Sequence, residues 1–296
     1  MKALTIGSMN IDHVYSVNHI VQPGETLTTS DMNIFLGGKG INQSMALAKA
    51  GATVYHSGMI GEDGEMFLDA CKEYGVNSDY IKKIDEKTGH TIIQVDENAQ
   101  NCILLYGGAN QCLTKEFVDD VLSHFEKGDI LLLQNEVNML PYIIDKAYEK
   151  GMKIALNPSP YDEKLSACDL KKISVFLLNE IEGGQVTGLS DPEEILDKLL
   201  ELYPDAQIVL TLGKDGAVYA DKNNRYSQPI FKVKAVDTTA AGDTFTGYFL
   251  AGLMNKMEIP DILKMSAKAS SIAVTRPGAV GSIPYRDEVI KALEEQ

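Results

Sequence analysis

Residues 236–247 combine the residue types of an anion-binding turn with a neighbouring base. Ala240, Ala241 and Gly242 are three small residues in a row, directly before Asp243 and the start of a helical pattern. Small residues at a helix start let backbone N–H groups approach an anion, and the helix dipole favours negative charge there. An aspartate at this place can also serve only as a helix cap, so this segment alone leaves both roles open.

A second segment, residues 37–43 (GGKGINQ), is a glycine-rich loop that opens a helix. It matches neither the G-x-x-x-x-G-K-[ST] loop nor the G-x-G-x-x-G of dinucleotide folds, and alone it indicates a turn with a surface lysine. Polar residues after predicted strands favour a ligand-binding role for this loop instead: Asn10 and Asp12 follow the first strand, and Glu136 follows a later one. Carboxylates and carboxamides over strand ends suit a polyhydroxylated ligand, because each hydroxyl both donates and accepts hydrogen bonds.

The elements that position these residues alternate between short apolar runs and amphipathic stretches. Buried strands are predicted at residues 4–7, 54–57, 130–133, 154–157, 175–179 and 208–213, with a β-rich run at 230–235 and a hairpin within 213–224. Helices are predicted at residues 41–50, 66–74, 140–150, 243–257, 261–275 and 286–295. The alternation predicts an α/β fold, a doubly wound, mostly parallel sheet flanked by helices, with ligands beyond the carboxyl ends of the strands.

Two stretches, residues 13–35 and 80–106, interrupt this alternation and carry no helix signal. Part of the second alternates with a period of two, which is typical of strands. We expect a small β-sheet lid, formed by about 11–36 and 80–107, within one domain that spans residues 1–296. Such a lid would exclude water from the site.

The charge of the chain argues against several classes of partner. With 27 Lys and Arg against 42 Asp and Glu, the formal net charge is −15, so nucleic acid and anionic membrane surfaces are not expected partners. A phosphate site would therefore depend on backbone N–H groups and helix N-termini. The first residues contain no apolar secretory segment, and the four cysteines lack metal-ligand spacing, so we expect free thiols and a cytoplasmic location.

Six segments lie in the order and spacing of the ribokinase-like (phosphofructokinase B-type) carbohydrate kinases, which the chain therefore resembles. They are residues 37–43 (GGKGINQ), 157–160 (NPSP), 179–182 (NEIE), 211–216 (TLGKDG), 237–245 (DTTAAGDTF) and 273–279 (AVTRPGA). The resemblance implies an ATP-dependent kinase that transfers a γ-phosphoryl group to a primary hydroxyl of a pentose. The GGKGxNQ form of the loop resembles the members that act on D-ribose, which would yield D-ribose 5-phosphate.

The resemblance also implies roles for individual residues. Asp243 would be the catalytic base, and Ala240, Ala241 and Gly242 would supply N–H groups to the transferred phosphoryl. With Asp243, the sugar would be held by Asn10, Asp12, Gly38, Lys39, Gly40, Asn42 and Glu136. With Gly242, ATP would be held by Asn179, Thr211, Gly213, Lys214, Asp215 and Gly216. Glu182 would organise Mg²⁺ through water.

The resemblance further implies a K⁺ activator site and a homodimer. The K⁺ site would be formed by Asp237, Thr239, Ala273, Arg276, Gly278 and Ser282. A plain capped loop in which Arg276 pairs with Asp237 is the alternative. Pairing through the lid would use an edge such as residues 102–106. Ala267 stands where ribokinase-like proteins commonly have Asn or His near the adenosine, which leaves the choice of nucleotide open.

Other functions remain as alternatives. The substrate could be fructose, deoxyribose, pseudouridine or adenosine, or the chain could be a catalytically silent sugar-binding protein of the same fold. A nicotinamide-dependent dehydrogenase is disfavoured because residues 7–10 (GSMN) replace the expected phosphate fingerprint after the first strand.

Overall fold

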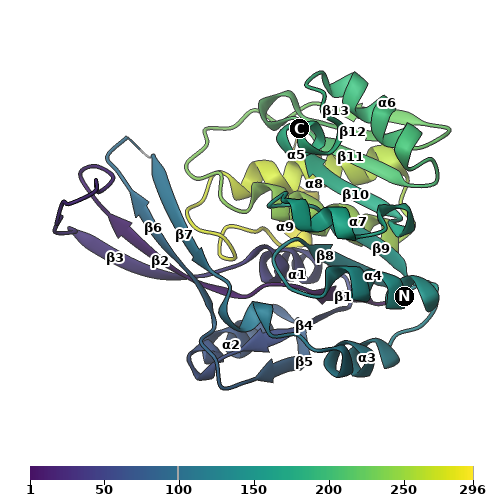
Figure 1. Ribbon diagram of the computed structural model, residues 1–296. Helices are drawn as coiled ribbons and strands as arrows, with labels where there is room; N and C mark the ends of the chain where they lie inside the picture. The colour runs from purple at the N-terminus through teal and green to yellow at the C-terminus, as the bar shows by residue number, and fades with distance from the viewer. Residues whose placement is uncertain (99, 296) are drawn as a thin grey trace.

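The computed structural model describes residues 1–98 and 100–295; residue 99, within the predicted lid, and residue 296 lie outside the described residues. Within them, nine strands form a large sheet (Figure 1). In spatial order these are β13 (Arg225–Gln228), β12 (Ala217–Ala220), β11 (Gln207–Thr211), β10 (Val175–Asn179), β9 (Lys153–Asn157), β8 (Ile130–Gln134), β1 (Ala3–Ile6), β4 (Val54–Ile60) and β5 (Asn77–Lys83). The strands from β11 to β5 pair in parallel, and β12 and β13 pair antiparallel.

The central strands are the short apolar runs of the sequence. Every residue of β1 and of β8 is buried, as strands covered on both faces require. One face packs against α1 (Lys39–Lys49), α2 (Glu65–Tyr74), α7 (Ala241–Met254), α8 (Ile259–Ala273) and α9 (Arg286–Glu294). The other packs against α3 (Lys115–Ser123), α4 (Leu140–Glu149), α5 (Glu180–Thr187) and α6 (Pro192–Leu202). The predicted doubly wound α/β fold is confirmed.

A separate four-stranded sheet projects from this body, with the order β3 (Asp31–Gly37), β2 (Asn10–Ser16), β6 (Gly89–Val95) and β7 (Asn101–Tyr106) (Figure 1). It is the predicted β lid. The second lid segment begins later than we expected, because β5 pairs in parallel with β4 and residues 80–83 therefore belong to the large sheet. Strand β2 begins four residues after β1 ends, so the lid grows directly from a carboxyl end of the large sheet.

The strand expected at residues 230–235 is absent from the described structure. A hairpin of β12 and β13 does form, but its second strand, Arg225–Gln228, lies just beyond the predicted residues 213–224. Strand β13 ends at Gln228, and the following Pro229 has no backbone N–H to continue a ladder. The apolar alternation of residues 230–235 instead lines a cavity.

Among the described residues, no helix combines the length and the apolar character needed to cross a membrane.

Candidate active site

The centre of the site lies between β1 and β8, where the order of strands reverses direction. The sheet continues from β1 to β4 on one side and from β8 to β9 on the other. Open α/β sheets bind ligands at the carboxyl ends of the strands at such a point. The Ser8 hydroxyl, just after β1, donates a hydrogen bond to Glu136, just after β8. The backbone N–H of Lys39 donates to the same Glu136 carboxylate at 3.0 Å, so the start of α1 is fixed to both strand ends.

Close backbone packing places this start of α1. Gly38 has a φ of 97°, which favours glycine. A Cβ on Gly40 would lie 2.4 Å from the backbone nitrogen of Ser8, so a larger residue would push α1 away from β1. The glycines of the loop are therefore needed for geometry.

The predicted sugar-binding residues Asn10 and Asp12 lie at the start of β2, where the lid joins the body. Oδ1 of Asn10 accepts a 2.8 Å hydrogen bond from Asn110, and Oδ1 of Asp12 accepts one of 2.6 Å from Thr91. Burial raises the pKa of Asp12, although the Thr91 hydrogen bond opposes this effect. Burial likewise raises the pKa of Glu136. Both carboxylates are thus taken out of bulk water, where a ligand hydroxyl would be a favourable partner.

Asp243 lies in the first turn of α7 and is 8% exposed. Its Oδ2 accepts a 3.1 Å hydrogen bond from Asn42 Nδ2, and its Oδ1 accepts one of 2.9 Å from Gln43 Nε2. Helices α1 and α7 pack closely here, since a Cβ on Gly247 would lie 2.3 Å from the Cβ of Ala46. The residue before α7, Ala240, has a φ of 58°, which forms the sharp turn ahead of the helix.

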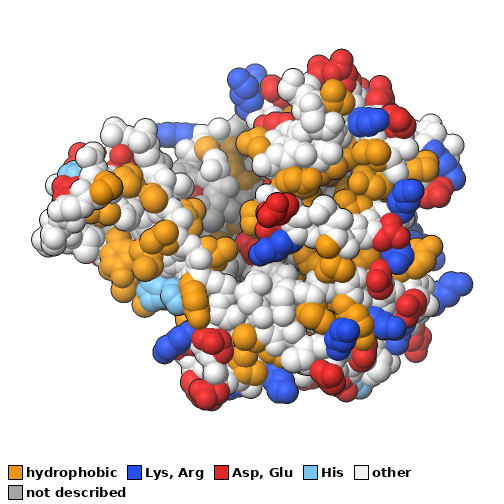
Figure 2. Space-filling view, in the orientation of Figure 1, with side chains coloured by type: hydrophobic (Ala, Val, Ile, Leu, Met, Phe, Trp, Pro, Cys, Tyr) orange, Lys and Arg blue, Asp and Glu red, His pale blue; other side chains and the backbone are white. Residues whose placement is uncertain are grey.

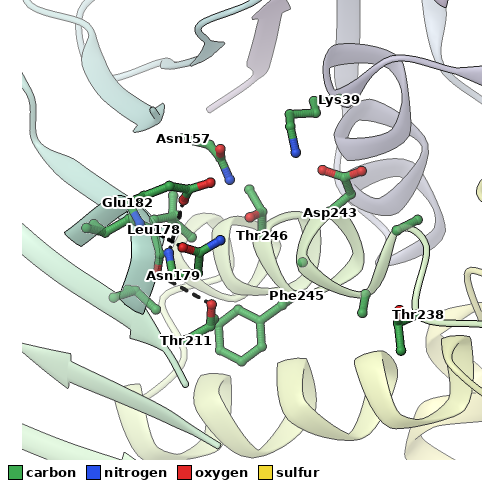
Figure 3. Close-up of a pocket in the computed structure, with 15 residues that line it drawn as sticks. Lys39, Asn157, Leu178, Asn179, Glu182, Thr211, Thr238, Asp243, Phe245 and Thr246 are labelled. Carbon is green, nitrogen blue, oxygen red and sulfur yellow. Dashed lines mark hydrogen bonds between the residues drawn. The ribbon is translucent and has the colours of Figure 1, made fainter. Parts of the chain in front are cut away.

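A cavity of about 250 Å³ opens above the start of α7 (Figure 3). Its lining includes Lys39, Asn157, Asn179, Glu182, Thr211, Thr238, Ala240, Ala241, Gly242 and Asp243. Burial alone would lower the pKa of Lys39, but the carboxylates of Asp243, Glu136 and Glu182 outweigh it and raise that pKa. Lys39 is therefore a charged ammonium that faces the cavity, which suits an anion.

A capping box fixes Asn179 and Glu182 at the opposite wall. The Asn179 side chain accepts from the Glu182 N–H at 2.9 Å, and Oε2 of Glu182 accepts from the Asn179 N–H at 3.0 Å. Glu182 is 8% exposed and lines the cavity. A carboxylate held this way fits a role beside a hydrated Mg²⁺ ion. Among residues 1–98 and 100–295, no cluster of three or more His, Cys, Asp or Glu side chains forms a direct metal site.

A second cavity of about 790 Å³ adjoins the first, and both are lined by Thr211, Thr238, Ala241, Gly242 and Phe245. Of the predicted nucleotide residues, Thr211, Gly213, Lys214, Gly216 and Gly242 line it, whereas Asn179 lines the smaller cavity. Asp215 lies in the 3-10 turn between Lys214 and Gly216. Phe231 and Ala267 supply apolar walls, which suit a flat ring system.

The residues predicted for K⁺ are only partly joined by hydrogen bonds. Oδ1 of Asp237 accepts from the Thr239 N–H at 2.8 Å, and its Oδ2 accepts from the Gly278 N–H at 2.9 Å. The Arg276 guanidinium pairs with Glu288, so the alternative in which it pairs with Asp237 is not what the structure contains. The backbone oxygen of Ala273 accepts from the Arg276 N–H, and the Ser282 hydroxyl donates to Ala279.

Several polar residues that support this site have no role predicted from the sequence. Gln43 stands within the glycine-rich loop motif, Gln134 ends the apolar run of β8, and Thr91 lies in the lid. Asn110 donates to Asn10 from a 3-10 turn that follows the lid. Of these residues, only Gln134 carries a sequence signal for a role in the site, because it is a polar residue at the end of an apolar strand.

The chain is similar to known carbohydrate kinases in sequence and in fold. The model of the pfkB family of carbohydrate kinases matches residues 1–286. The ribokinase of Haemophilus influenzae is 36% identical over 303 residues, which cover 99% of both chains. The structure of a ribokinase from Thermotoga maritima matches with a TM-score of 0.89 at 32% identity, over 99% of both chains.

A ribokinase of Arabidopsis thaliana, complexed with ribose and ATP, matches with a TM-score of 0.87 at 27% identity, over 99% of this chain and 98% of that one. The identity and coverage extend over nearly the full chain, and the α/β body and lid are common to the fold. This chain therefore belongs to the pfkB family of carbohydrate kinases and is a ribokinase-type phosphotransferase.

Proposed function

We propose that this kinase transfers the γ-phosphoryl group of ATP to the primary hydroxyl of a pentose, and that D-ribose is the pentose. The observation that carries the proposal is the position of Asp243. Its buried carboxylate lies at the N-terminus of α7, faces the cavity that contains Lys39, and is bonded to Asn42 of the sugar-binding set. A base, an anion-binding turn and a polar sugar site thus meet at one point.

In the proposed reaction, Asp243 accepts the proton of the sugar hydroxyl while the oxygen of that hydroxyl forms a bond to the γ-phosphorus. The bond from that phosphorus to the bridging oxygen breaks, and ADP leaves with the electron pair. The N–H group of Gly242, at the helix start, would stabilise the negative charge on the transferred group, and the N–H of Ala241 would exchange its 3.3 Å hydrogen bond with the Thr238 oxygen for one with that group. The Lys39 ammonium would add a positive charge on the same cavity wall.

Two ions belong to the proposal. Glu182 would hold water bound to Mg²⁺, which when present neutralises the phosphate oxygens. Asp237 would hold K⁺ with oxygens of the loop around Gly278 and, because its carboxylate also accepts from Thr239, that ion would stabilise the turn before α7. The adenosine of ATP would bind in the larger, apolar cavity of about 790 Å³.

The choice of ribose is supported by the relatives, of which one structure holds ribose and ATP. The test is a panel of ribose, deoxyribose, fructose, adenosine and pseudouridine, each assayed with ATP and magnesium. We expect the highest kcat/KM for ribose, with phosphate on the primary hydroxyl. A higher kcat/KM for another member would contradict ribose, and no turnover with any of them would favour a silent sugar-binding protein.

We also propose that two copies pair through their lids. Figure 2 shows hydrophobic side chains gathered on the lid. Ile103, Leu104 and Leu105 of β7 are 53%, 65% and 51% exposed, on a strand at the edge of its sheet. An apolar edge strand of this kind tends to find a partner strand. Sedimentation should show a dimer, and Leu104→Lys should shift it to monomer; a wild-type monomer would contradict the proposal.

A further inference from the structure

Two buried glutamines connect the carboxylate of Asp243 to the end of β8. Nε2 of Gln43 donates a 2.9 Å hydrogen bond to Oδ1 of Asp243, and Nε2 of Gln134 donates one of 2.6 Å to Oε1 of Gln43. Both glutamines are 0% exposed. The chain of hydrogen bonds joins α7, α1 and β8, which are far apart in the sequence and meet only in the folded protein.

The direction of these hydrogen bonds is fixed by chemistry. A carboxylate can only accept, so Gln43 must turn its NH₂ group toward Asp243 and its oxygen toward Gln134. Gln134 must then present its own NH₂ group. Asn42 holds the other carboxylate oxygen at 3.1 Å. The terminal torsion of an aspartate is otherwise broad, so donors on both oxygens restrict the rotation of the carboxylate.

The glutamine at position 134 has a cost for the fold. Its Oε1 is buried and has no hydrogen-bond partner among the described residues. A Cβ on Gly7 would lie 2.5 Å from this oxygen, so the backbone of Gly7 packs against it. A buried acceptor without a partner destabilises the folded state, whereas an apolar side chain of similar shape would not. Packing alone therefore does not account for an amide here.

We propose that Gln43 and Gln134 are positioning residues for catalysis: Gln43 orients the carboxylate of Asp243, and Gln134 orients the amide of Gln43. The proposal rests on the proposed function, in which Asp243 is the base. Neither glutamine lines the cavity beside Asp243, so they act through Asp243 and not on the substrate. Their removal should slow the chemical step and leave sugar and ATP binding nearly unchanged.

The test compares Gln43→Met, Gln134→Met and the control Ser44→Ala with wild type. The quantities measured are kcat, the KM for sugar and for ATP, and the Tm of thermal unfolding. Gln43→Met should lower kcat by roughly 10- to 100-fold, and Gln134→Met by a smaller factor, because small misplacement of a reacting group is costly. Both KM values should stay within about twofold of wild type if only orientation changes. The Tm of Gln134→Met should stay close to that of wild type, because the unpartnered Oε1 of Gln134 is removed while Oε1 of Gln43 loses its donor.

Ser44→Ala is the matched control. Ser44 is the next residue of α1, is equally buried, and its hydroxyl forms a 2.9 Å hydrogen bond with Nδ1 of His56, away from Asp243. Its loss removes a buried hydrogen bond of the same helix without touching the carboxylate. We expect a wild-type kcat for this variant. A fall in kcat equal to that of Gln43→Met would show a general effect of disturbing α1 and would overturn the proposal.

A double-mutant cycle separates this inference from the proposed function. In the Asp243→Asn background, adding Gln43→Met should change the residual kcat by less than about twofold, because the group that Gln43 orients is already lost. The full reduction in that background would overturn the inference. So would wild-type kcat in both Gln43→Met and Gln134→Met while Asp243→Asn is inactive. Wild-type activity in Asp243→Asn would instead contradict the proposed function itself.

Discussion

The Thr91 hydroxyl donates a 2.6 Å hydrogen bond to Oδ1 of Asp12. The two residues are direct partners in the parallel pairing of β2 with β6. A Cβ on Gly37 would lie 1.9 Å from Oδ2 of Asp12, so the carboxylate rests against the last residue of β3, which is also the first residue of the glycine-rich loop. The two lid strands that flank β2, namely β3 and β6, therefore fix this carboxylate between them, at the place where the sugar is proposed to bind.

Truncation of this carboxylate should weaken sugar binding. We expect Asp12→Ala to raise the sugar KM by about 5- to 150-fold, the range for a lost buried hydrogen bond of about 1–3 kcal/mol, with the ATP KM nearly fixed. Steady-state kinetics with each substrate varied in turn measures both. Asp31→Ala, which removes an exposed carboxylate at the far end of β3, is the control and should leave both unchanged. Equal rises in both KM values would argue against a sugar-specific role.

The pH dependence of sugar use should follow from the same burial. Burial raises the pKa of Asp12 and of Glu136, so both protonate above the ordinary carboxyl range of about 4. Protonated, each accepts fewer hydrogen bonds from sugar hydroxyls. The kcat/KM for sugar should therefore fall on the acid side at a pH above that range, and Asp12→Asn should reduce this dependence. An identical profile in the variant would rule out Asp12 as its source.

The same raised pKa values bear on stability. At a pH between the pKa of each carboxyl group in the unfolded chain and its raised pKa in the folded protein, the folded state binds more protons. The free energy of unfolding should therefore fall as the pH rises through that range.

Lys49 should give stability the opposite pH dependence. Its buried ammonium donates to the backbone oxygens of Val280 and Ile283 at 2.8 and 3.0 Å. Burial lowers its pKa from 10.5 to about 8; Arg276 adds to this, and Glu73 and Glu288 oppose it. Between about pH 8 and pH 10.5 the unfolded chain binds more protons at Lys49 than the folded protein does. The contribution of Lys49 to the free energy of unfolding therefore rises with pH, by at most about 1.4 kcal/mol per pH unit.

Denaturant unfolding of wild type and Lys49→Met over that pH range measures the effect. The difference in unfolding free energy, wild type minus variant, should increase from about pH 8 to pH 10.5. Lys291→Met, which removes an exposed ammonium on α9, is the control and should show no such trend. A flat difference for Lys49→Met would contradict the burial effect.

Potassium should raise kcat with little change in either KM. The Asp237 carboxylate links the Gly278 loop to the turn before α7, so an ion held there would stabilise the anion-binding N–H groups. The assay replaces potassium with tetramethylammonium at constant ionic strength, in wild type and in Asp237→Ala. Activation should be lost in the variant. An unchanged wild-type kcat would contradict the site, and equal activation by every monovalent cation would indicate screening.

Much of the fold could be predicted because buried parallel strands are short apolar runs, and β8 and β10 are such runs. Pairing was harder to predict. Strand β5 has a mixed polar sequence and joins the large sheet only through β4, so period alone placed part of it in the lid. Residues 230–235 show that an alternating pattern forms no strand without a partner.

The site was predictable to the extent that its residues follow strands or lie in a motif, as Asp243 and Glu136 do. The sequence could not pair Asp12 with Thr91, because that contact depends on the register of β2 against β6. It also could not connect Asp243 to Gln43, or Gln43 to Gln134, because these contacts depend on how closely α1, α7 and β8 approach one another.

The central claim is that Asp243 is the base of a sugar kinase, and the kcat of Asp243→Asn tests it most directly. The amide is nearly isosteric and can keep the place of the side chain, but it cannot accept the proton. With ribose, ATP and magnesium, we expect kcat to fall by roughly 10²- to 10⁴-fold, the usual range for loss of a general base, with the fold and sugar binding retained. Turnover at more than about a tenth of the wild-type rate would contradict the account.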